Sequence, residues 1–171
     1  KLQPTYQDSP GIQLMNVAVD AIEGPRPLYR YAFSSSRWAT GLASFDKERL
    51  IANFNTKYVK SNISREQLIV VDNPDNYLTT ELVPCVTFDT ILDRASRDTI
   101  DFLITDVEGH DVKILDAFPF GRVRPANIIF ELPMRRDASL DAFLAKLRDQ
   151  DYDVFISQAD AIAMLRGAKP S

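Results

Sequence analysis

Residues 100–111 read Ile-Asp-Phe-Leu-Ile-Thr-Asp-Val-Glu-Gly-His-Asp, an apolar run followed by acids, a glycine and the chain's only histidine. The apolar run, residues 102–104, is typical of a strand that is buried on both faces. Val112, Leu115 and Phe118 then follow at the spacing of one helix face. The stretch therefore predicts a strand, a sharp polar turn and a helix.

The polar turn is the best candidate for a functional site. In open α/β sheets, ligands bind at the carboxyl ends of the strands, which is where Asp106 and Glu108 fall. Gly109 allows the chain to turn tightly. His110 titrates near neutral pH and is chemically suited to proton transfer. We therefore take Asp106, Glu108 and His110 as the candidate catalytic residues.

We expect a single α/β domain over residues 1–171. Its charge gives no reason to expect a strongly charged binding partner. The chain has 171 residues, 45% of them hydrophobic, and a net charge of -4. This balance argues against a nucleic-acid surface and against a polybasic membrane anchor. No apolar run approaches the ~20 residues of a membrane span. The single cysteine, Cys85, excludes an internal disulfide, and we expect a cytoplasmic protein.

Apolar patterning predicts the order of the elements. Strands are expected over residues 12–19, 28–33, 67–71, 83–87, 102–104, 127–132 and 152–156. Helical stripes are expected over residues 50–58, 89–95, 112–118 and 140–147, with a short apolar element at 161–165. The second half is therefore a βαβ series with a largely parallel sheet. Residues 34–84 read as an insertion-rich middle.

Several segments together resemble a known family. Residues 100–109 are similar to the core motif of the FkbM-type S-adenosylmethionine-dependent methyltransferases. Residues 12–19, 86–92, 124–131 and 160–163 are similar to further pieces of that family, in the same order. The resemblance covers most of the chain and corresponds to the C-terminal two-thirds of the family's domain. It implies a Rossmann-like class I methyltransferase sheet flanked by helices, with S-adenosylmethionine as cofactor.

The family's glycine-rich cofactor loop has no counterpart in this sequence. The six glycines include no G-x-G pair, and Thr105 stands where the family often has lysine. By the resemblance, the sheet lacks its first two strands and the domain is N-terminally incomplete. An upstream segment, a rearranged sheet or another chain would have to complete it, and we favour an upstream segment. These residues alone are expected to bind S-adenosylmethionine poorly.

The resemblance also implies roles for individual residues. Asp106 would hold the cofactor's amino group or orient the acceptor, and Val17 and Ala18 would line the adenine. Glu131, at the end of the next strand, would face the substrate. The structural alternatives are a helix cap for Asp106, strand packing for Val17 and Ala18, and a hydrogen-bonded strand-end acid for Glu131.

The implied activity is O-methylation of a sugar or secondary-metabolite hydroxyl, with a possible homodimer as the active species. Glu108 or His110 would take the acceptor's proton. Two alternatives stay open. One is a non-catalytic methyltransferase-like binding module, which the missing glycine loop favours. The other is a metal-dependent hydrolase that uses Asp106, Glu108, His110 and Asp111 as ligands.

Overall fold

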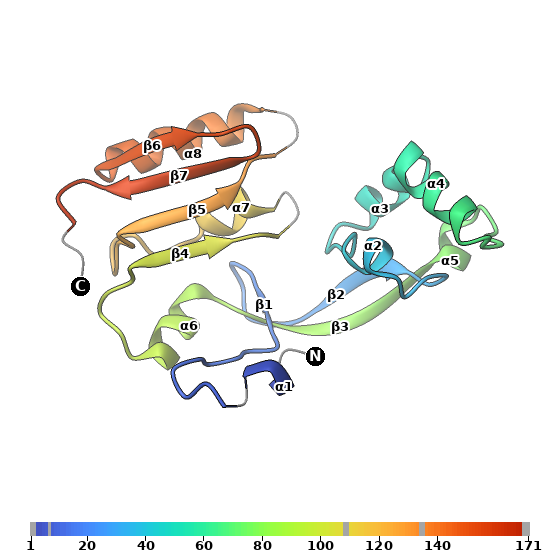
Figure 1. Cartoon of the computed structure of the whole chain (residues 1–171), viewed down its shortest axis with the longest axis horizontal. Helices are drawn as coiled ribbons and strands as arrows, with labels where there is room; N and C mark the ends of the chain where they lie inside the picture. Colours follow the sequence, from blue (N-terminus) through green and yellow to red (C-terminus); the bar gives the residue numbers. More distant parts are fainter. Residues whose placement is uncertain (1–2, 7, 108–109, 134–135, 169–171) are drawn as a thin grey trace.

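The computed structural model describes residues 3–6, 8–107, 110–133 and 136–168. Within these residues the chain forms two separate β-sheets and eight helices (Figure 1). The mixed α/β class is therefore confirmed, while the Rossmann-like methyltransferase sheet that lacks its first two strands stays a prediction. No helix in the described ranges is both long enough and apolar enough to cross a bilayer.

The second half forms a four-stranded sheet of order β4-β5-β7-β6. Its strands are β4 (Phe102–Thr105), β5 (Asn127–Glu131), β6 (Tyr152–Ile156) and β7 (Asp160–Leu165). β4 and β5 are parallel, and β7 is antiparallel to both β5 and β6, so β6 runs in the direction of β4 and β5. The expectation of a largely parallel sheet is therefore confirmed for these three strands. β7 is the exception, because a tight turn closed by a Ser157 N–H to Asp160 C=O bond of 2.8 Å folds it back beside β6.

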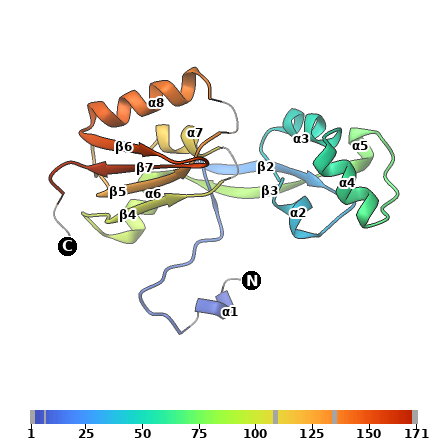
Figure 2. The ribbon, with the colours of Figure 1, turned by 45° about the horizontal axis from the view of Figure 1, so that its top comes forward.

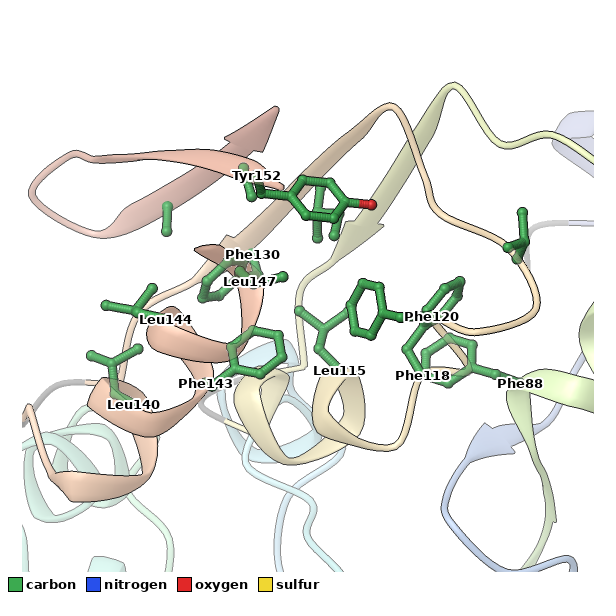
Figure 3. Packing of buried hydrophobic residues seen from close by; sticks show 14 of the residues in the cluster. Phe88, Leu115, Phe118, Phe120, Phe130, Leu140, Phe143, Leu144, Leu147 and Tyr152 are labelled. Atoms are coloured by element: carbon green, nitrogen blue, oxygen red, sulfur yellow. The ribbon is translucent and has the colours of Figure 1, made fainter. Parts of the chain in front are cut away.

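One face of this sheet carries the main hydrophobic core. It is covered by α7 (Asp111–Asp116) and α8 (Ala138–Asp149), with α6 (Phe88–Ala95) contributing at one side. Figure 3 shows the α8 stripe turned toward Phe130 and Tyr152. The buried α8 side chains are those expected from the spacing: Leu140, Phe143, Leu144 and Leu147. Their burial against β5 confirms the prediction for this helix and strand.

The opposite face of the sheet is open. Phe102 and Ile104 of β4 are 62% and 64% exposed, and Phe155 and Ile162 on the neighbouring strands are also exposed. The expectation that β4 is buried on both faces is therefore wrong. The reason is that the described helices pack on the other face of the sheet.

The first predicted strand is much shorter than expected. Of residues 12–19, only β1 (Ala18–Val19) is a strand, parallel to β3 (Leu78–Val86). Ile12 and Leu14 are exposed. A strand forms only where a neighbour satisfies its backbone groups, and β3 reaches only these two residues.

The expected insertion-rich middle forms an arm, which we define as residues 24–86. β2 (Gly24–Tyr31) and β3 pair in antiparallel fashion along their length. They lead to a helical end made of α2 (Arg37–Thr40), α3 (Lys47–Phe54), α4 (Lys57–Arg65) and α5 (Pro74–Tyr77) (Figure 1 and Figure 2). This end has its own core, in which the Phe54 and Tyr77 rings stack 4.0 Å apart. The remaining helix, α1 (Gln3–Tyr6), lies at the amino end.

The apolar stripe expected over residues 50–58 belongs to two helices. α3 ends at Phe54, and Thr56 caps α4 by accepting a 3.3 Å bond from the Val59 N–H. The new helix rotates the pattern, so Val59 is buried and Tyr58 is exposed. The expected strand at residues 67–71 does not form either.

Thr56 provides a test of this helix boundary. Thr56→Ala should lower the free energy of unfolding by about 1 kcal/mol, because the Val59 N–H loses its acceptor. The Thr56 hydroxyl also donates to the Asn53 carbonyl, at 2.7 Å, so the change also affects the end of α3. Urea unfolding followed by circular dichroism would measure the effect. Thr56→Ser keeps the hydroxyl and should unfold close to wild type; equal losses in both variants would contradict the capping role.

Candidate functional site

The candidate site lies at the carboxyl ends of β4 and β5. These strands are parallel, with Thr105 opposite Phe130 in the register. Asp106 follows β4 and Glu131 ends β5, so both carboxylates stand at the same edge of the sheet. In Figure 1 both arrowheads point toward the side where α2 and α3 of the arm lie. The structure thus brings together two residues that the sequence placed at strand ends.

The turn after β4 is held by the first residue of α7. Asp111 is 1% exposed, and its Oδ2 accepts a 3.4 Å bond from the Val107 N–H. The His110 N–H donates to the Val107 carbonyl at 3.3 Å. Glu108 and Gly109 lie outside the described residues, so the role of Glu108 stays a prediction. Asp106 itself is exposed at the start of this turn.

Two buried polar atoms near this turn lack a hydrogen-bond partner within the described part of the chain. They are the Thr105 Oγ1 and the Asp111 Oδ1. An unpaired buried polar group costs roughly 1–3 kcal/mol. Both atoms are buried and closed to a ligand, whereas the Asp106 carboxylate is exposed. Of these three residues, Asp106 is therefore the one that would attract the positive charge of S-adenosylmethionine.

The described glycines do not identify the rest of a cofactor site. A Cβ atom added at Gly11, Gly24, Gly121 or Gly167 would have no neighbour within 4 Å, so packing within the described chain does not require glycine at these four positions. Val17 and Ala18, which the resemblance placed at the adenine, are half-buried. Ala18 of β1 lies opposite Cys85 of β3. Their position beside β3 is therefore compatible with adenine binding and equally with plain strand packing.

His110 stands between the β4–α7 turn and the arm. Its ring is half-buried, and the Nε2 atom is 3.5 Å from the Ser44 Oγ. Burial, followed by the nearby charges of Arg49 and Lys113, lowers the pKa of His110 below its usual 6.5. The carboxylates of Asp46 and Asp111 act in the opposite direction without reversing this shift. The imidazole is therefore neutral at pH 7 and able to accept a proton.

The metal alternative gains no support from this geometry. Across residues 3–6, 8–107, 110–133 and 136–168, no three side chains of the histidine, cysteine, aspartate and glutamate types come together as a metal site would require. Asp106 is exposed, whereas Asp111 is buried under the turn.

Sequence reasoning missed two residues of this region. Ser44 was not among the candidate site residues, and it does not cap α3, because Asp46 takes that role by accepting from the Arg49 N–H at 3.2 Å. Asp111 was considered only as a metal ligand, although it shapes the turn. No sequence signal links Ser44 to His110, because they are 66 residues apart.

The comparisons with known proteins agree with the resemblance. The family model described as the methyltransferase FkbM domain matches residues 4–154. The chain therefore belongs to the FkbM methyltransferase family. No curated protein and no solved structure gives a significant match to the chain.

Proposed function

We propose that this protein is an S-adenosylmethionine-dependent O-methyltransferase acting on a hydroxyl of a small molecule, such as a sugar or a secondary metabolite. The observation that carries the proposal is the neutral His110 on the turn that follows β4 and Asp106. One short segment thus carries His110, which can take a proton from a hydroxyl, and Asp106, whose carboxylate can attract a cation. The acidic net charge of -4 supports a small acceptor over a nucleic acid. A cytoplasmic location is part of the same proposal.

In this proposal each candidate residue has a separate role. S-adenosylmethionine, when bound, supplies an electrophilic methyl group. Asp106 would attract the positive charge of the cofactor, and Val17 and Ala18 would line its adenine. Glu131 would orient the acceptor from the end of β5. The acceptor hydroxyl would lose its proton to His110, which becomes an imidazolium, or to Glu108, as its oxygen takes the methyl group and S-adenosylhomocysteine is left.

Cofactor binding is the direct test. S-adenosylhomocysteine would be titrated calorimetrically into the longest natural polypeptide that carries this sequence, beside the 171-residue chain. Micromolar binding by the longer polypeptide supports the proposal, and weak binding by these residues alone would assign the glycine loop to another segment. Absence of binding by a folded, full-length protein would overturn the cofactor assignment.

The second candidate is a non-catalytic binding module of the same family. The missing glycine loop favours it, because the six glycines of the sequence include no G-x-G pair that could hold a cofactor. The same titration separates the two functions. A homodimer is compatible with either function, and light scattering on the titrated samples would detect it.

A further inference from the structure

Ser44 connects the arm to the candidate site. Its backbone pairs with Tyr29 of β2 through two hydrogen bonds, of 2.9 Å and 3.0 Å. Its side chain is buried, and the Oγ lies 3.5 Å from the His110 Nε2, at the outer limit of a hydrogen bond. Catalytic hydrogen bonds are often this long before substrate binds. The Ser44 hydroxyl is thus fixed to the arm and directed at the imidazole.

The other partner of Ser44 leaves its hydroxyl hydrogen free for this contact. The Asp46 N–H donates to the Ser44 Oγ at 3.1 Å, so one lone pair of that oxygen is already in use. The hydroxyl hydrogen remains available as a donor to His110. A ring nitrogen that accepts a hydrogen bond carries no proton, so a neutral imidazole in this contact has its proton on Nδ1.

We propose that Ser44 is a positioning residue, whose hydroxyl holds the neutral His110 ring in the Nδ1–H tautomer with its Nε2 lone pair on the side of the arm. This inference rests on the proposed function for its purpose, since a base must present an unprotonated nitrogen. On binding, the acceptor hydroxyl would replace the Ser44 hydroxyl as the donor to the single Nε2 lone pair. The acceptor's proton would move to Nε2 as its oxygen takes the methyl group and S-adenosylhomocysteine is left, and the proton on Nδ1 would remain.

The charged groups around His110 are consistent with this arrangement. Arg49 of α3 and Lys113 of α7 disfavour a positive ring, while Asp46 and Asp111 favour it. Since burial and the two cations prevail, the ring is neutral at pH 7 and has a defined tautomer to hold. Ser44 is the described hydroxyl that contacts the ring.

The single histidine makes the test direct, because one set of imidazole signals reports His110 alone. Two-bond hydrogen–nitrogen NMR spectra of the ¹⁵N-histidine-labelled chain at pH 7.5 should show a protonated Nδ1 and an unprotonated Nε2. Ser44→Ala should lose this preference and give a mixture or the opposite tautomer. Ser44→Thr keeps the hydroxyl and should keep the wild-type pattern. Ser61→Ala, a change of the same kind at an exposed position on α4, should have no effect.

An unchanged tautomer in a folded Ser44→Ala protein would overturn the inference, as would a protonated Nε2 in the wild type. If Ser44→Ala fails to fold, the wild-type tautomer and Ser44→Thr still decide the question. These spectra need no cofactor, so their outcome is independent of the proposed activity. With an active preparation, Ser44→Ala should lower kcat about tenfold with little change in the cofactor's KM, and Ser44→Thr should restore it.

Discussion

Replacing Asp106 by asparagine should reduce methyl transfer by about 10²–10³-fold, the usual effect of removing one electrostatic contact at a reacting centre. The carboxylate follows β4 at the edge where ligands of open α/β sheets bind, and it faces solvent. Asparagine keeps the size but removes the negative charge and replaces one acceptor oxygen by an NH2 donor. Asp106→Ala should abolish turnover. Transfer of a radiolabelled methyl group to the acceptor would measure both effects.

Because Asp106 is exposed, neither change should alter the fold, and the urea midpoint should stay near wild type. Asp98→Asn is a matched control, since Asp98 is also exposed but precedes β4 at the other end of the strand. It should leave turnover unchanged. Full activity in Asp106→Asn would remove Asp106 from the site, and an equal loss in Asp98→Asn would point to a general charge effect.

The elements that sequence analysis predicted well are those whose burial is decided locally. α8 carries four apolar residues on one face, and β5 alternates buried and half-buried positions, so each pattern identifies its own core side. These two elements pack against each other in the main cluster, with the Phe130 and Phe143 rings 5.6 Å apart. The periodicity of each segment was sufficient to predict this pair.

The elements that were predicted wrongly depend on neighbours that the pattern does not contain. The apolar run in β4 indicates burial on two faces, yet Phe102 and Ile104 are exposed because the described helices pack on the other face of the sheet. Residues 12–17 alternate like a strand but have no partner. β7 becomes an inner strand only because the chain folds back after β6. In each case tertiary contacts decided the outcome.

The candidate site likewise has one part that the sequence could predict and one part that it could not. The placement of Asp106 and Glu131 at one edge was predictable, because each follows an apolar run and parallel strands end together. The surroundings of His110 were not, since Ser44 and Arg49 come from the arm. A lone histidine at the start of a helix is typically exposed, whereas here the arm half-buries it and thereby changes its protonation.

His110→Gln should lower kcat by about 10²–10⁴-fold, because glutamine resembles the neutral ring in size but cannot take a proton. Because the pKa of His110 is lowered, the direction of the pH dependence of activity can be predicted. In the wild type, kcat/KM should rise with pH as the ring loses its proton, with a midpoint below 6.5, and stay level above it. The variant should lose this rise, and a profile that keeps it would assign the base to Glu108.

The same residue should leave a signature in stability that needs no cofactor. Burial, Arg49 and Lys113 lower the pKa of His110 in the folded chain, so between that pKa and 6.5 the unfolded chain binds more protons. Stability should therefore decrease as pH falls through this window and be insensitive to His110 above 6.5. His110→Gln removes this contribution, so its urea midpoint should depend less on pH than that of the wild type. Identical pH dependence in both proteins would show that the ring is not held neutral by its surroundings, and the argument for His110 as the base would fail with it.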